Sequence, residues 1–274
     1  MILLVNDDGI DAPGFRALYR ALRRVVGEAV LAVAPTVERS GMSHAISVDR
    51  PLSVTARIEP GFAGFAVDGT PTDCTKIALD RLCREPPRLV VSGINRGPNV
   101  GRSVLYSGTV GAAMEAAVLG LSALAVSRQV EAATVDDGAE FAAQWARTML
   151  GRKEFAGRVV NLNLPGSPAS DWREPVVRAH GHAGFREGYR QVRDDAGSAG
   201  TGGSAAGSNW RLHGDWVPGT AADDATALTA GHPVLTLLRP DFNAPDSALR
   251  RLVEGRHREK NEKTSSKGRT SVRT

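Results

Sequence analysis

The chain has 274 residues and a mass of 29.0 kDa, enough for one large domain with a buried core. Its 42% hydrophobic and 23% charged residues are ordinary for a globular enzyme, and no apolar run approaches the roughly 20 residues of a membrane helix. Residues 250–274 hold nine Lys or Arg and three Asp or Glu, which leaves the rest of the chain with a net charge of −2. The basic pI therefore does not predict nucleic-acid binding by the folded body, and we expect residues 247–274 to form a disordered tail.

The number of cysteines and the first residues of the chain indicate the cellular compartment. Cys74 and Cys83 are too few for a disulfide framework. The beginning of the chain shows neither a basic leader nor the apolar stretch of a secretory signal. We therefore expect a cytoplasmic protein with no membrane partner.

Short apolar runs alternate with amphipathic stretches through the first two thirds of the chain. The apolar runs predict buried strands at residues 1–5, 29–35, 88–93, 122–127 and 158–165. Helical spacing of apolar residues predicts helices from Pro13 to Gly27 and at about 72–83, 109–119 and 137–150. This alternation predicts an α/β fold with a Rossmann-like, mostly parallel sheet and helices on both faces.

The pattern becomes irregular after Pro165. Residues 174–193 are compatible with a hairpin, and the Gly/Ser/Ala-rich stretch 194–210 predicts a mobile loop. A short helix is expected at 222–231 and a final strand at 233–240. We predict one domain over residues 1–246, with a C-terminal hairpin and helix excursion, followed by the tail 247–274.

Two adjacent carboxylates, Asp7 and Asp8, follow the first predicted strand in the run Asn6-Asp7-Asp8-Gly9. In open parallel sheets, ligands bind beyond the carboxyl ends of the strands. At a strand end that turns through Gly9, both carboxylates can face the same side, where a cation or a shared proton must offset their repulsion. Asp8 or Asp11 could instead cap the following helix, but two adjacent acids and an Asn exceed what a cap requires. We favour a metal-binding or catalytic role.

Polar residues follow the next predicted strands as well. Ser40, Gly41 and His44 come after the second strand, and the run SGINRGPNVG after the third contains Asn95 and Asn99. Carboxylate, hydroxyl and amide oxygens suit Mg²⁺ or Mn²⁺. Asn and Gly also occur in loops for conformational reasons, and His44 fits loop packing as well as a place near the site.

The run YSGTVGAAMEA places Ser107, Gly108 and Thr109 at the N-terminus of a predicted helix. Two hydroxyls, free backbone N–H groups and the positive end of the helix dipole favour phosphate binding over an ordinary N-cap. The sequence has no GxxxxGK[ST] loop, and no GxGxxG follows the first strand. These absences argue against a kinase, an NTPase and a dinucleotide dehydrogenase, but not against phosphate chemistry.

Five motifs in this order and spacing resemble the SurE (survival protein E) family of nucleotidases: NDDG, RSG…HAIS, VDGTPTDC, SGINRGPNVG and YSGTVGAAMEA. The resemblance runs from Met1 to about Pro165. It implies a Rossmann-like core that hydrolyses nucleoside 5′-monophosphates, often 3′-monophosphates and sometimes short polyphosphate, with one divalent metal ion per subunit. It also implies a homodimer or homotetramer.

The resemblance assigns roles to individual residues. The family's metal ligands fall on Asp7, Asp8, Ser40 and Asn95. Its phosphate-binding residues fall on Ser107, Gly108 and Thr109, to which we add Gly41 and Asn99. Asp7 or Asp8 would accept the proton of the attacking water. Two alternatives stay open: a non-catalytic nucleotide- or phosphate-binding regulator on the same fold, and a phosphatase of other small phosphate esters.

Overall fold

The computed structural model describes residues 1–129, 135–192, 209–217, 219, 222–241, 250, 251 and 254. The chain divides into two units, Met1–Pro240 and Asp241–Thr274, and every helix and strand named below belongs to the first. Most of the predicted loop at 194–210 and of the predicted tail at 247–274 lies outside the described residues. Among the described residues, no helix combines the length and the apolar character that a membrane crossing needs.

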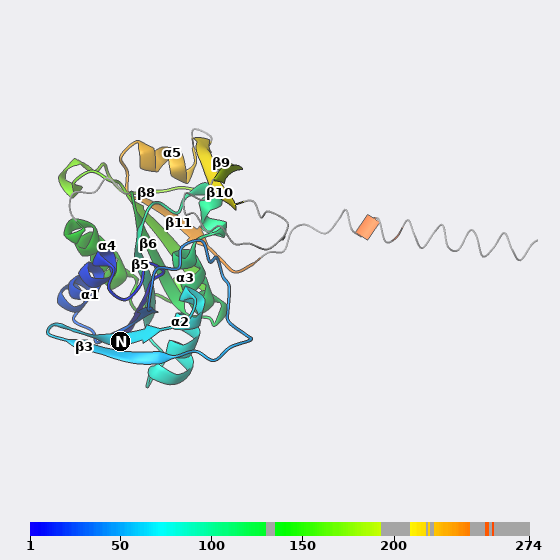
Figure 1. The fold of residues 1–274 in the computed structure, drawn as a ribbon. Helices are drawn as coiled ribbons and strands as arrows, with labels where there is room; N and C mark the ends of the chain where they lie inside the picture. The colour runs from blue at the N-terminus through cyan, green and yellow to red at the C-terminus, as the bar shows by residue number, and fades with distance from the viewer. Residues whose placement is uncertain are drawn as a thin grey trace, which may run out of the picture. The chain divides into compact units, whose positions relative to one another are not determined.

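A nine-stranded sheet forms the centre of the first unit, in the order β3-β4-β2-β1-β5-β6-β7-β11-β8 (Figure 1). Its strands are β1 (Ile2–Val5), β2 (Val30–Pro35), β3 (Val54–Glu59), β4 (Phe62–Val67), β5 (Leu89–Arg96), β6 (Ser122–Arg128), β7 (Arg158–Leu164), β8 (Val176–Val177) and β11 (Val234–Leu238). Neighbours from β4 to β7 pair in parallel, whereas β3 and β11 run antiparallel to β4 and β7. The predicted α/β fold with a mostly parallel sheet is confirmed.

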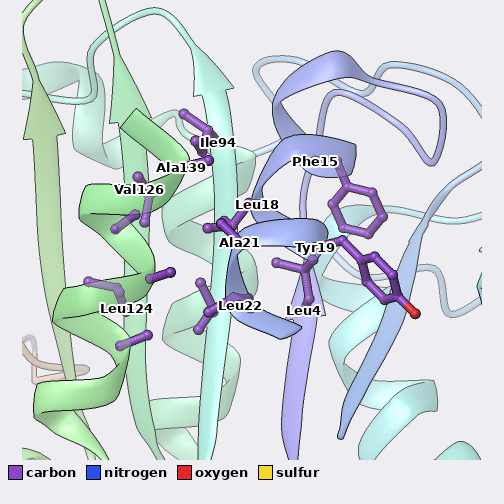
Figure 2. Close-up of a cluster of buried hydrophobic side chains, with 14 of the residues drawn as sticks. Leu4, Phe15, Leu18, Tyr19, Ala21, Leu22, Ile94, Leu124, Val126 and Ala139 are labelled. Atoms are coloured by element: carbon purple, nitrogen blue, oxygen red, sulfur yellow. The ribbon is translucent and has the colours of Figure 1, made fainter. Parts of the chain in front are cut away.

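Helices cover both faces of this sheet (Figure 1). They are α1 (Pro13–Val25) and α4 (Asp136–Met149) on one face, and α2 (Pro71–Ile77, continued by a π-helical turn over Ala78–Leu82) and α3 (Gly108–Val118) on the other. The short helix α5 (Asp224–Thr229) packs in a separate apolar cluster. Alternate residues of β1 join two different cores: Leu4 packs with α1 and α4, and Leu3 packs with α2 and α3. Figure 2 shows the first of these cores, with Leu18 and Leu22 of α1 beside strand residues such as Leu124.

The strands and helices predicted from apolar periodicity up to residue 165 are confirmed to within a few residues. The hairpin of β3 and β4 was not predicted. Almost every residue of β3 is exposed, so it lacks the apolar run that reveals a buried strand. Gly61, with φ +78°, supplies the turn between the two strands.

The expected C-terminal hairpin and helix are present as β9 (Gly184–Val192) with β10 (Asn209–Val217) and as α5, but the hairpin does not lie within residues 174–193. Within that range β8 pairs in parallel with β11, whereas β9 pairs antiparallel with β10. Asn209 and Trp210 therefore belong to a strand rather than to the predicted mobile loop. The prediction failed because the partner strand lies beyond residues 193–208, a connection much longer than an ordinary hairpin turn.

The strand order reverses between β1 and β5. From β1 the chain goes to β2 and β4 on one side, and β5 then returns to the other side of β1. The carboxyl ends of β1 and β5 thus flank a topological switch point, where open α/β sheets bind their ligands.

Candidate active site

A tight turn ends β1 and sets the direction of the two acids. Asn6 is fully buried, and its Nδ2 donates to the carbonyl oxygen of Gly9 at 2.9 Å. Gly9 has φ +99°, and a Cβ atom there would lie 3.3 Å from the backbone of Val37. A residue with a side chain would be strained at this position, which explains the glycine of the NDDG motif.

Asp7 points toward the N-terminus of α3. Its side chain is buried, with the residue only 3% exposed, and the hydroxyl of Thr109 donates a hydrogen bond to its Oδ1. A Cβ atom at Gly108 would lie 2.9 Å from the Cβ of Asp7, so only glycine lets the helix approach this closely. The pKa of Asp7 is raised to about 6, mainly by burial and in smaller part by the negative charge of Asp8, while the hydrogen bond from Thr109 opposes the rise.

Asp8 points to a different element. Its Oδ2 accepts a hydrogen bond of 3.1 Å from the backbone N–H of Arg96 at the end of β5. Partial burial raises its pKa, and the negative charge of Glu38 adds to that effect. The two adjacent acids are therefore held by separate elements, α3 and β5, on either side of the end of β1.

Asn95 lies at the end of β5 and lines the same cavity as Asp8. Its Nδ2 donates to the carbonyl oxygen of Gly97 at 2.7 Å, which uses the donor end of the amide and leaves its oxygen as an acceptor. Asn99 is engaged in the fold: its Nδ2 donates to the Oγ of Ser127 at 2.8 Å, and its backbone N–H to Asn163 at 2.7 Å. Asn99 thus anchors the loop after β5.

Ser40 and Gly41 are exposed and follow β2. The hydroxyl of Ser40 donates to Glu38 Oε1 at 2.7 Å, and the backbone N–H of Arg39 donates to the carbonyl oxygen of Asp7 at 2.7 Å. This backbone bond brings the segment to the end of β1. Glu38 was not predicted as a site residue, although an acid two positions before Ser40 was a usable signal.

Ser107 is the N-cap of α3, and its Oγ accepts a hydrogen bond of 3.1 Å from the N–H of Val110. The capping alternative is therefore realised for Ser107. Thr109, in contrast, is fully buried and bonds to Asp7, so the first turn of α3 holds a carboxylate of the protein itself.

A cavity of about 380 Å³ opens at the switch point. Asp8, Glu38 and Asn95 contribute oxygen-bearing side chains to its wall. The other lining residues are Ala12, Pro13, Gly14, Ile94, Arg96, Arg128, Gln129 and Val135. The site thus joins two carboxylates and an amide to a partly apolar hollow, within the size range of small-molecule pockets.

In the part of the chain that the structure describes, no three His, Cys, Asp or Glu side chains gather closely enough to hold a metal ion. A cation at this site would need hydroxyl, amide or water oxygens besides the carboxylates. That donor set suits a hard divalent ion.

Comparison with known proteins shows the family. The family model described as "Survival protein SurE" matches residues 2–187. The chain belongs to the SurE family. Curated SurE relatives include "5'-nucleotidase SurE" of Nitratidesulfovibrio vulgaris, 41% identical over 255 residues that cover 91% of this chain and 97% of that protein. The protein of the same name from Geobacter sulfurreducens is 46% identical over 182 residues, covering 66% of this chain and 68% of the relative.

The SurE fold also appears in a solved structure. The crystal structure of the SurE protein from Aquifex aeolicus superimposes with a TM-score of 0.74 and 27% sequence identity. The match covers 92% of this chain and 99% of that one. The family resemblance read from the five motifs is thereby confirmed.

Proposed function

We propose that the protein is a divalent-metal-dependent phosphomonoesterase that hydrolyses nucleoside 5′-monophosphates to nucleoside and phosphate. The observation that carries the proposal is the buried carboxylate of Asp7, held against α3 and next to Asp8 at the switch point. The SurE relatives named above are 5'-nucleotidases, which supports the choice of substrate. The proposal extends to nucleoside 3′-monophosphates and short polyphosphate as further substrates.

The residues present fit a hard divalent cation. Burial raises the pKa of both Asp7 and Asp8, so a positive charge beside them would stabilise their ionised forms. We assign Asp7, Asp8, Ser40 and Asn95 as the side chains that would hold one Mg²⁺ or Mn²⁺. When bound, the ion supplies charge neutralisation for the phosphate and lowers the pKa of the attacking water.

Groups of the protein itself are assigned to proton transfer and to phosphate binding. Asp7 or Asp8 is assigned to accept the proton of the attacking water; each already accepts one hydrogen bond from the chain, Asp7 from Thr109 and Asp8 from the backbone N–H of Arg96. The hydroxyl of Ser107 and the backbone N–H of Gly108 are assigned to hold phosphate oxygens at the positive end of α3.

The leaving nucleoside is assigned to the cavity of about 380 Å³, which begins at Asp8 and Asn95. Its apolar wall, which includes Ala12 and Ile94, suits the flat face of a base. This placement puts the ester bond between the phosphate-holding helix and the cavity.

We also propose a homodimer or homotetramer. The β9–β10 hairpin exposes five large apolar side chains: Phe185, Tyr189, Trp210, Leu212 and Trp216. Exposed apolar patches of this kind are typical of surfaces that meet another subunit. Light scattering of the full chain tests this: a monomer at micromolar concentration would contradict it.

Phosphate release from a substrate panel tests the function. Protein stripped with EDTA should release no phosphate from nucleoside 5′-monophosphates, and Mn²⁺ should restore turnover. The panel adds a 3′-monophosphate, tripolyphosphate and a sugar phosphate. Nucleotide binding without turnover under every metal would favour the regulator, and preference for the sugar phosphate would favour the other phosphatase.

A further inference from the structure

Residues 40–47, here called the Ser40 strap, leave the active site and cross the outer face of α3. Gly111 of α3 lies directly beneath: a Cβ atom there would be 2.1 Å from the carbonyl oxygen of Ser43. Ser43 itself has φ +54°, a left-handed conformation that residues with side chains seldom adopt. The strap is therefore held tightly against the helix whose first turn contacts Asp7.

The centre of the strap is fastened by a buried carboxylate. Glu115 of α3 is 7% exposed in its side chain, and each of its two oxygens has a different partner. Nε2 of His44, on the strap, lies 2.8 Å from Oε2, and Nζ of Lys76, on α2, lies 2.9 Å from Oε1. We call His44, Glu115 and Lys76 the Glu115 clasp. A carboxylate buried this deeply is stable only with such partners.

Both flanks of His44 are also attached. Ser43 donates through its backbone N–H to Tyr106 O at 3.0 Å and through its hydroxyl to Leu105 O at 2.7 Å. Ser47 N donates to Asp73 Oδ1 at 3.0 Å. These bonds tie the strap to the residues before α3 and to α2. The segment with Ser40 and the segment with Ser107 are thus joined directly.

We propose that His44 is a positioning residue, which through its bond to Glu115 holds the Ser40 strap, and with it Ser40, in register with Asp7 and the N-terminus of α3. The inference rests on the proposed function only in taking Ser40 as a ligand of the cation. It adds that the cation's affinity depends on a histidine that touches neither cation nor substrate. Ser40 is exposed, and among the described residues its hydroxyl is bonded only to Glu38. Its position therefore depends on its neighbours in the chain: Arg39, bonded to Asp7 O on one side, and the strap on the other.

The test measures Mn²⁺ binding to the full chain by calorimetry, without substrate, together with the melting temperature. Loss of a group that orients a metal ligand typically weakens metal binding about 10- to 100-fold, and we expect this for His44→Ala. His44→Gln, whose amide can donate to the same carboxylate, should recover most of the affinity. The matched control is Lys76→Met, which removes the other partner of Glu115 without touching the strap. It should bind Mn²⁺ as the wild type does, whatever its melting temperature.

The outcomes separate the inference from the function on which it rests. Wild-type affinity in His44→Ala would overturn the role of His44, and so would an equal loss in Lys76→Met. Loss of affinity in His44→Gln as large as in His44→Ala would also contradict a role through the hydrogen bond. A wild-type protein that binds no Mn²⁺ would instead contradict the proposed function itself.

Discussion

Thr109 donates its hydroxyl hydrogen bond to Asp7, and this contact joins two residues 102 positions apart in the chain. Asp7 follows the end of β1 and Thr109 lies in the first turn of α3, so the bond sets the strand end against the helix N-terminus. It also opposes the effect of burial on the pKa of Asp7. The contact therefore governs both the position and the charge of the carboxylate.

Thr109→Val removes the hydroxyl while keeping nearly the same shape. Without this hydrogen bond the pKa of Asp7 should rise above its value of about 6. We expect the acid limb of the pH–activity profile to move to higher pH, and the free energy of unfolding at pH 8 to fall by about 1–3 kcal/mol. Thr109→Ser, which keeps the donor, is the control. An unmoved acid limb in Thr109→Val would contradict the coupling.

Asp7→Asn should change how stability depends on pH. In the metal-free wild type, Asp7 keeps its proton up to about pH 6 when folded, whereas an unfolded Asp loses it near 3.8. Folding therefore favours the protonated form between these values, so stability falls as pH rises from about 4 to 6, by on the order of 3 kcal/mol. The amide of Asp7→Asn does not titrate, so the variant should not show this contribution to the fall in stability.

Chemical denaturation with a chelator present, at several values from pH 4 to pH 8, measures this difference. The advantage of Asp7→Asn over the wild type should be largest at pH 8 and smallest at pH 4, while its Mn²⁺ binding is lost. A variant less stable than the wild type at pH 8 would show that burial does not penalise the Asp7 charge.

Gly108→Ala tests the close approach of α3 to Asp7. The added Cβ would stand 2.9 Å from the Cβ of Asp7 and 3.0 Å from its Oδ2, so the carboxylate or the helix must move. We expect the variant to lose about 1–3 kcal/mol of stability. We also expect it to lose most of its activity. Gly120→Ala is the control: it meets nothing within 4 Å but is strained by its φ of +81°, so it should lose stability and keep activity.

Ala12→Leu fills the cavity assigned to the nucleoside. We expect the KM for a nucleoside 5′-monophosphate to rise about tenfold, since the base must give up apolar contact worth on the order of 1–3 kcal/mol. Competitive inhibition by inorganic phosphate, which does not enter the cavity, should stay unchanged. Ala63→Leu, on the exposed side of β4, is the control. An equal rise in the inhibition constant of phosphate would show that the cavity is not the nucleoside site.

Most buried elements were predictable and the exposed ones were not; β4 is the exception, since its largely buried run FAGFAV was missed. Residues 2–5 are all buried, so an uninterrupted apolar run identified β1. The exposed β3 has no such run, and β10 lies too far from β9 in sequence for its pairing to be inferred. The switch point itself followed only from the observed strand order.

Some residues of the candidate site were likewise predictable from the sequence and others were not. Asp7 and Asp8 could be singled out because two adjacent carboxylates after a buried strand repel each other unless a cation or a proton offsets their charge. The bond from Thr109 and the Glu115 clasp could not be predicted, because each depends on side chains brought together by the fold. His44 and Glu115 are 71 residues apart, and neither is unusual in its local sequence.

The central claim is that a divalent cation is held where β1 and β5 end. The most direct measurement is anomalous diffraction from a crystal of the full chain soaked with Mn²⁺ and inorganic phosphate. We predict a manganese peak within coordinating distance of the four assigned side chains, Asp7, Asp8, Ser40 and Asn95, with phosphate at the N-terminus of α3. Manganese density elsewhere, or none at full soak, with both carboxylates still bonded to Thr109 and Arg96, would contradict the account.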